Sequence, residues 1–226
     1  MDQAKISGAC NRLERNLPLR GNQARLPQSL RRLHQSILRY YLQHGKAPRQ
    51  SDITDFAADW SAAIDRLAAD QIVLVEPGGS ISGAYPFTSE ERGFKVISNY
   101  GAVNAMCAFD AIAVSSMFGL PTRIESSCRI SGRDIVIEQD AAKLQVIEPE
   151  ITVFAAIDWH ARDSTVSCSA SLCTEMMFIA GKDEAAKWQD RNPSSRELFT
   201  LDEAHAFICA VFLPLMSRQG AIEKSA

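Results

Sequence analysis

Hydrophobic residues repeat at helical spacing in the first half of this chain, at strand spacing in its middle, and at helical spacing again near its end. Short strand-like segments between two helical regions are typical of an α+β fold with a mostly antiparallel sheet. The 226 residues, of which 46% are hydrophobic, are enough to bury a core without disulfide bonds. We therefore predict an α+β protein in which helices pack against that sheet.

The N-terminal part of the chain divides into two predicted regions. Residues 1–26 are polar and rich in arginine, so we expect a flexible arm. Residues 27–97 contain a helix that Gly45 ends, a short helix capped by Ser51 that includes Phe56, a helix over 61–70, and a hairpin. Three helices followed by a hairpin predict a winged-helix-like module.

Residues 98–226 are predicted to form the α+β core. Asn104 is expected to cap a helix over 105–118, which ends at Gly119. The later elements are expected as a hairpin over 124–138, strands over 144–147, 151–157 and 166–179, and helices over 184–190 and 201–216.

The interpretation of the six cysteines depends on the expected cellular compartment. The chain starts without the pattern of a secretory signal, and its longest apolar stretch is about half of the ~20 residues that span a bilayer, so we expect a cytoplasmic protein. In a reducing compartment, cysteines are thiols rather than a disulfide framework. They are Cys10, Cys107, Cys128, Cys168, Cys173 and Cys209. The absence of CxxC spacing argues against a structural zinc site.

Cys107 and Asp110 lie three residues apart in an apolar segment and share one face of the expected helix. In a first helical turn, the backbone N–H groups and the helix dipole favour the Cys107 thiolate. Apolar neighbours raise the pKa of Asp110 while the dipole lowers it, so the sequence leaves its protonation state open. Taken alone, the pair is also typical of a core cysteine and of an aspartate placed for the helix dipole.

The other candidate ligands carry weaker signals. Cys173 heads a second apolar run, whereas Cys128 and Cys209 are expected to be structural core residues. Strand alternation places Cys168 and Cys173 on opposite faces, which argues against joint ligation. Cys10 carries no signal. The histidines have no metal-ligand spacing and are interpreted as structural or surface residues: His34, His44, His160 and His205.

A DNA-binding function is disfavoured by charge. The segment 59–71, which would serve as a recognition helix, contains Asp59, Asp65 and Asp70 against Arg66 alone. A helix that enters the major groove should be basic. The net charge of −3 also gives no sign of affinity for polyanions, so we expect neither nucleic acid nor membrane as a partner.

Several segments in a fixed order resemble the bacterial alkylmercury (organomercurial) lyases over about residues 27–216. The resemblance depends on the helical N-terminal module, on Trp188, and on four segments, which in chain order are Gly83-Ala84-Tyr85-Pro86-Phe87-Thr88, Met106-Cys107-Ala108-Phe109-Asp110, Ile124-Glu125-Ser126-Ser127-Cys128, and Cys173 ahead of Phe178-Ile179-Ala180. An ordered series of this kind is much more specific than any one motif.

The resemblance implies a carbon–mercury lyase for mercury resistance and detoxification, whose catalytic core lies in residues 98–226. It implies that Cys107 and Cys173 hold mercury as thiolates, that Asp110 carries the proton and is a possible further ligand, and that Cys128 is structural. Soft thiolates are the preferred ligands of mercury(II). No cofactor is then needed, because the metal enters with the organomercurial substrate. Low-molecular-weight thiols and a mercuric reductase are the implied partners.

The chain departs from the family pattern at two positions near the site and leaves alternatives open. Met106 stands where some members have Trp, and Thr174 stands where some have a second Cys. These changes affect pocket shape or product handling. One alternative is a non-catalytic thiol-based sensor or regulator of soft metals. Another is a family-like lyase that cleaves a different carbon–heteroatom bond.

Overall fold

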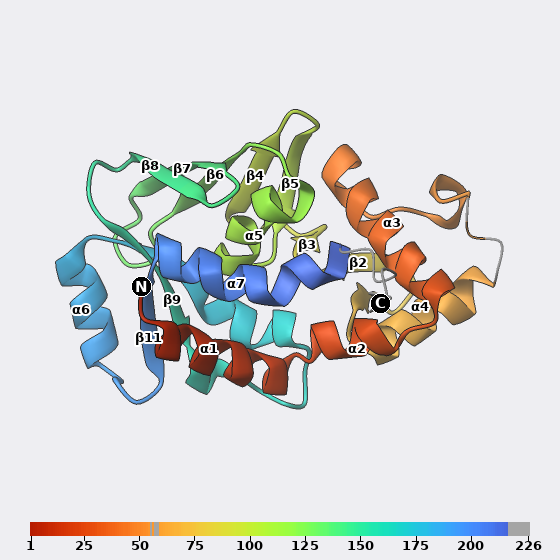
Figure 1. Cartoon of the computed structure of the whole chain (residues 1–226), viewed down its shortest axis with the longest axis horizontal. Coiled ribbons are helices and arrows are strands. Elements are labelled where there is room, and N and C mark those ends of the chain that lie inside the picture. The colour runs from red at the N-terminus through yellow and green to blue at the C-terminus, as the bar shows by residue number, and fades with distance from the viewer. Residues whose placement is uncertain (55, 57–58, 217–226) are drawn as a thin grey trace, which may run out of the picture.

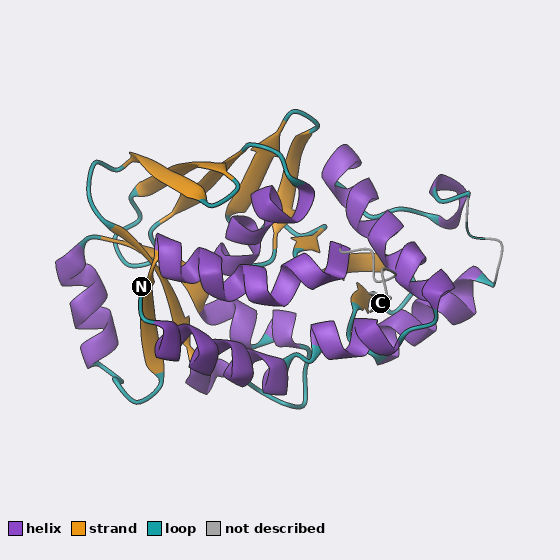
Figure 2. Ribbon diagram, viewed as in Figure 1, coloured by secondary structure: helices purple, strands orange, loops and turns teal. Residues whose placement is uncertain are grey.

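The computed structural model describes residues 1–54, 56 and 59–216. It is an α+β structure in which two antiparallel sheets are flanked by helices, as the sequence predicts (Figure 2). The helices are α1 (Gln3–Asn16), α2 (Leu19–Arg25), α3 (Gln28–His44), α4 (Trp60–Ala69), α5 (Ala108–Phe118), α6 (Lys182–Asp190) and α7 (Leu201–Met216). Four 3-10 turns are η1 (Gln50–Asp52), η2 (Trp159–Ala161), η3 (Cys168–Ala170) and η4 (Leu172–Glu175).

The larger sheet has eight strands in the order β1-β2-β3-β5-β4-β6-β7-β8, and the smaller has three in the order β10-β9-β11. Their bounds are β1 Val73–Val75, β2 Ile81–Ala84, β3 Phe87–Thr88, β4 Phe94–Ser98, β5 Gly101–Ala105, β6 Thr122–Ser127, β7 Asp134–Asp140, β8 Lys143–Glu148, β9 Val153–Asp158, β10 Met176–Ala180 and β11 Arg196–Thr200. Neighbouring strands in both sheets are antiparallel; for example, Val96 pairs with Ile124 and Ala155 with Phe178.

Helix α5 lies at the centre of the molecule. It packs against strands of the larger sheet and against β10, and α7 covers its other side (Figure 1). Its residues 108–115 are all buried, as expected for a helix that is apolar on every face. Near its start, Phe109 packs against Phe199 and Phe207 with ring centroids 5.6 and 5.5 Å apart. This aromatic cluster fixes the first turn of α5.

Residues 3–16 and 19–25 form the helices α1 and α2, so the prediction of a flexible arm over residues 1–26 is wrong. Asp2 caps α1 by accepting hydrogen bonds from the N–H groups of Ala4 and Lys5. Ile6, Ala9 and Leu13 form a narrow apolar stripe that is buried, and α1 runs beside α7 (Figure 1). The stripe is difficult to recognise among polar residues because it gains its stability from packing on α7 rather than from helix propensity.

The helices and the hairpin predicted within residues 27–97 are present, apart from the short second helix. Gly45 ends α3 in the left-handed conformation, with φ 67°. Only η1 forms after Arg49, and part of the expected second helix falls at residues 55, 57 and 58, which lie outside the described residues. The β1–β2 hairpin continues through β3 into the larger sheet, and the expected boundary after residue 97 lies inside β4. The winged-helix resemblance of this region stays a prediction.

Two local predictions in residues 98–226 need correction. Asn104 lies in β5 and does not cap a helix, because residues 101–105 pair with β4, and α5 begins at Ala108. The strand expected over 166–179 is limited to Met176–Ala180, and η3 and η4 precede it. Strands β4, β5 and β11 have no counterpart among the predicted elements.

Candidate active site

Cys107 occupies the N-cap position of α5, so its thiol faces Asp110 in the first helical turn. Its backbone is extended, and its Sγ accepts a hydrogen bond from the Asp110 N–H at 3.5 Å. The same sulfur donates to Asp110 Oδ2 at 2.8 Å. The two side chains therefore lie together, as the sequence predicts. They do so because Cys107 caps the helix, and not because both residues occupy helical positions.

Cys173 reaches the same place from another part of the chain. It lies in η4, immediately before β10, whose first residue Met176 has its sulfur 3.9 Å from the Cys107 sulfur. The two cysteine sulfurs and a carboxylate oxygen of Asp110 all lie within 4.8 Å of one another, and all three side chains are buried. Two soft sulfurs and one carboxylate at this separation are a suitable ligand set for a thiophilic metal.

Burial sets the protonation of the resting site. It raises the pKa of the Cys107 thiol to about 11, with the Asp110 charge acting in the same direction. This corrects the expectation of a resting Cys107 thiolate, because loss of solvation outweighs the helix N-terminus. Contacts with the thiols of Cys107 and Cys168, together with burial, hold the pKa of Cys173 well above its ordinary value.

Burial also raises the pKa of Asp110 from 3.8 to about 7, although the hydrogen bond from Cys107 and the charge of Arg92 oppose the change. Arg92 is held beside the site by donating to the Ser169 carbonyl at 2.6 Å and by pairing with Glu90 at 2.6 Å. A carboxyl group with a pKa near neutrality can both accept and release a proton under working conditions.

The Asp110 shift predicts a pH-dependent stability. Between about pH 4 and pH 7 the folded protein retains a proton on Asp110 that the unfolded chain has lost, so the free energy of unfolding falls as pH rises. This stabilisation, of the order of a few kcal/mol, is complete below about pH 4 and is lost as pH rises through about 7. Urea unfolding across this range is expected to show a smaller decline for Asp110→Asn. Equal declines in both proteins would contradict the assignment.

The segment 83–88 packs against the site. A Cβ at Gly83 would approach Met106 Cε to 2.7 Å and the Phe87 carbonyl oxygen to 3.1 Å, so a larger residue at this position would displace the end of the Met106 side chain. Tyr85 is buried, and its hydroxyl accepts a hydrogen bond from Ser169 N–H at 2.9 Å. Burial, together with the nearby thiols and Asp110, raises the pKa of Tyr85 well above its ordinary value.

A further thiol, Cys168, lies against the site, contrary to the strand-based prediction. Its Sγ is 3.9 Å from that of Cys173, because η3 and η4 replace the expected strand and bring both side chains to one side. Sequence reasoning missed it because alternation applies only to extended chain. The spacing of five residues between Cys168 and Cys173 does not by itself predict that they lie on two consecutive 3-10 turns.

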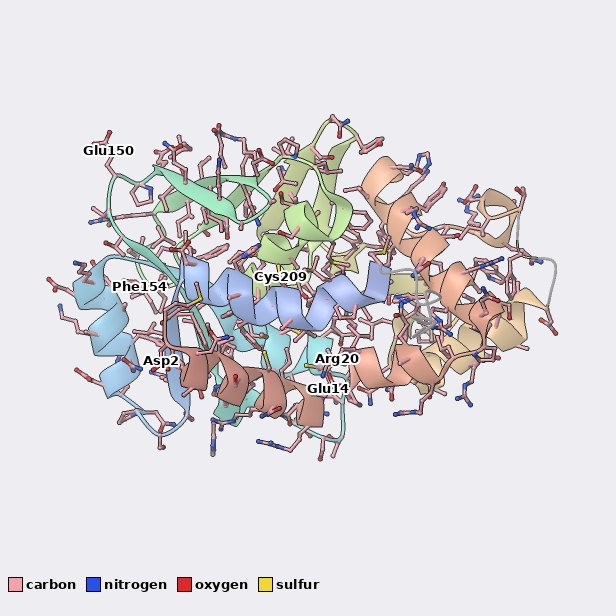
Figure 3. The ribbon with its side chains drawn as sticks, in the orientation of Figure 1. Asp2, Glu14, Arg20, Glu150, Phe154 and Cys209 are labelled. Carbon is pink, nitrogen blue, oxygen red and sulfur yellow. The ribbon has the colours of Figure 1, made fainter. Side chains whose placement is uncertain are left out.

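The remaining cysteines lie elsewhere in the described structure. Cys128 is buried, and its sulfur accepts hydrogen bonds from the N–H groups of Ala180 and Ser131, at 3.3 and 3.4 Å, which suits a structural role. Cys209 lies on α7 (Figure 3), where its sulfur is 3.2 Å from His205 Nε2. Cys10 lies on α1 and contacts the Phe207 carbonyl.

Within the described residues, no helix is long and apolar enough to cross a membrane.

Comparisons with known proteins agree with this arrangement. Residues 87–213 match the MerB alkylmercury lyase family. Alkylmercury lyases from Bacillus cereus and Clostridium butyricum are each 26% identical over 98 residues, which is 43% of this chain and 44% of each relative. The aligned part thus spans less than half the length of these curated relatives.

A solved structure shares the fold. It is described as the crystal structure of the mercury-bound form of MerB2, and it superposes with a TM-score of 0.69 at 20% identity, covering 88% of this chain and 98% of that one. At this identity the likeness establishes the fold. The match to the family covers more than half of the chain, and the chain therefore belongs to the alkylmercury lyase family.

Proposed function

We propose that this protein is an organomercurial lyase that cleaves carbon–mercury bonds by protonolysis, with Cys107 and Cys173 as mercury ligands and Asp110 as proton donor. The observation that carries the proposal is the buried hydrogen bond from Cys107 Sγ to Asp110 Oδ2, 2.8 Å long, with the Cys173 sulfur beside it. This contact joins a mercury-binding sulfur directly to a proton carrier.

The reaction begins with proton transfer within this pair. Asp110 takes the Cys107 proton as the sulfur attacks mercury in R–Hg–SR′ and displaces the thiolate R′S⁻. Direct transfer over the 2.8 Å contact matters, because burial raises the pKa of the Cys107 thiol to about 11 and leaves little free thiolate. Cys173 then binds the same mercury, and its proton leaves with R′S⁻ as R′SH.

Protonolysis follows on the dithiolate-bound substrate. Two thiolates increase the electron density on the carbon attached to mercury, and protonated Asp110 transfers its proton to that carbon. The carbon–mercury bond breaks, R–H leaves, and mercury(II) stays on Cys107 and Cys173 while Asp110 becomes a carboxylate again. The pKa of Asp110 near 7 suits it to both roles.

The proposal assigns no resident cofactor, since the metal belongs to the substrate. Low-molecular-weight thiols supply R′S⁻ and remove the product mercury, and a mercuric reductase is the proposed final acceptor. These partners follow from the chemistry, because only another soft ligand competes with cysteine thiolates for mercury(II).

Headspace gas chromatography tests the function directly. Purified protein given methylmercury and excess small thiol is expected to release methane over many turnovers. A Cys209→Ser variant, which removes a buried thiol on α7 that contacts His205 and not the cluster, is expected to do the same. Stoichiometric mercury binding without methane would instead identify a thiol trap or sensor, and salt-dependent retention on DNA would then be measured. Methane release from another class of substrate alone would identify a different lyase.

A further inference from the structure

A third thiol, that of Cys168, contacts one of the two cysteines that the proposed function assigns to mercury. Cys173 Sγ lies 3.9 Å from Cys168 Sγ and within 4.8 Å of Cys107 Sγ. All three thiols are buried. Cys173 thus has a neighbouring thiol in addition to Cys107, and the reaction proposed above uses only Cys107 and Cys173.

The position of Cys168 is fixed by the surrounding backbone. Its carbonyl accepts from Ser171 N–H at 3.2 Å, and Ala170 N–H donates to the Ser167 carbonyl at 3.1 Å, closing η3. The N–H of Ser169 donates to the Tyr85 hydroxyl, and its carbonyl accepts from Arg92. Tyr85 and Arg92, which lie beside the site, thereby hold η3, the turn that carries Cys168.

We propose that Cys168 takes over the product mercury from Cys107, so that mercury(II) rests on Cys173 and Cys168 after the hydrocarbon has left. The inference rests on the proposed function for its place in the reaction. In the exchange, the Cys168 sulfur forms a bond to mercury, the bond from Cys107 to mercury breaks, and the Cys168 proton ends on the Cys107 sulfur. Mercury remains a neutral dithiolate before and after the step, and no oxidant or reductant is required.

Transfer of mercury from Cys107 to Cys168 is favoured by its effect on Asp110. When Cys107 holds mercury, its sulfur has no proton to donate, and the buried Asp110 carboxylate loses the hydrogen bond present in the metal-free structure. Loss of a hydrogen bond by a buried polar group is unfavourable. Transfer to Cys168 returns the proton to Cys107 and restores the 2.8 Å contact with Asp110. The exchange thus resets the proton-carrying pair.

A cavity lies next to the turn that carries Cys168. It has a volume of about 270 Å³, and its lining includes Ser167 and Ser169, the residues on either side of Cys168, and Arg92. Cys168 itself is fully buried and does not line the cavity. Whether a small thiol removes mercury from this side is measured by the release experiment below.

Mercury(II) chloride provides a test that requires no carbon–mercury cleavage. One equivalent is added to the reduced protein, and the metal is located by its anomalous scattering in crystals. The expected position is between Cys173 and Cys168 in the natural chain, and between Cys107 and Cys173 in Cys168→Ser and Cys168→Ala. Mercury between Cys107 and Cys173 in all three proteins would overturn the proposal, whether or not the protein releases methane from methylmercury.

Transfer kinetics give a second measurement on the same samples. Release of the bound mercury to glutathione is expected to slow by about tenfold or more in both Cys168 variants, as is typical when a residue that supports a metal site is lost. Cys209→Ser serves as the control and is expected to release mercury at the natural rate. Equal rates in all the proteins would count against a relay through Cys168. Retained circular dichroism and thermal midpoints separate this effect from unfolding.

Discussion

An Asp110→Asn variant is expected to bind methylmercury stoichiometrically and to release methane at least about 100-fold more slowly than the natural chain. The amide has nearly the shape of the carboxyl group but cannot accept the Cys107 proton or pass one to carbon. Both sulfurs remain, so mercury retention should persist. Gel filtration followed by mercury analysis measures binding, and headspace chromatography of the same samples measures hydrocarbon release.

A control for this variant must also neutralise a buried carboxylate. Glu203 on α7 pairs with Lys5 at 2.8 Å on the α1 side, so Glu203→Gln removes a buried charge outside the cluster. Its methane release is expected to stay near the natural rate. Normal turnover by Asp110→Asn would exclude Asp110 as the proton donor. Loss of mercury binding in that variant would instead assign Asp110 to ligation.

A Cys107→Ser variant is expected to lose methane release by at least about 10⁴-fold, because removing one member of a catalytic unit costs nearly as much as removing all of it. The serine oxygen is a hard donor and a weak ligand for mercury(II). Methylmercury retention through Cys173 alone should be weaker than in the natural chain. Headspace chromatography and competition with glutathione measure the two effects.

The double variant Cys107→Ser/Asp110→Asn sharpens this prediction. If the two residues act as one unit, the double variant is expected to be no slower than Cys107→Ser alone. A further loss equal to the single effect of Asp110→Asn would show that the two residues act independently, and the proposed proton transfer between them would then be abandoned.

The sequence predicts the main helices and the α+β class because their hydrophobic periods are long and regular. It fails where tertiary contacts decide local structure. Asn104 has the chemistry of a helix cap, yet pairing of 101–105 with β4 places it in a strand. Helix α1 depends on a narrow stripe that α7 covers, so polar composition alone misleads.

The candidate site is likewise predicted from the sequence only in part. The cluster of Cys107, Asp110 and Cys173 is predicted from residue types and from the family resemblance, and the structure brings these side chains together. The protonation state of Cys107 is not predictable, because it depends on a degree of burial that no local pattern encodes. Cys168 is missed because η3, the turn that carries it, is held by Tyr85 and Arg92, which are distant in sequence.

Residues 108–115 of α5 are buried, so the two parts of the site differ in how far their surroundings tolerate substitution. Cys107 and Asp110 sit at the start of a helix enclosed by sheet, aromatic cluster and α7, so substitutions there disturb the whole core. Cys173 and Cys168 lie on short turns that follow the exposed segment 163–166. Substitutions in the exposed segment 163–166 are therefore expected to disturb the core least.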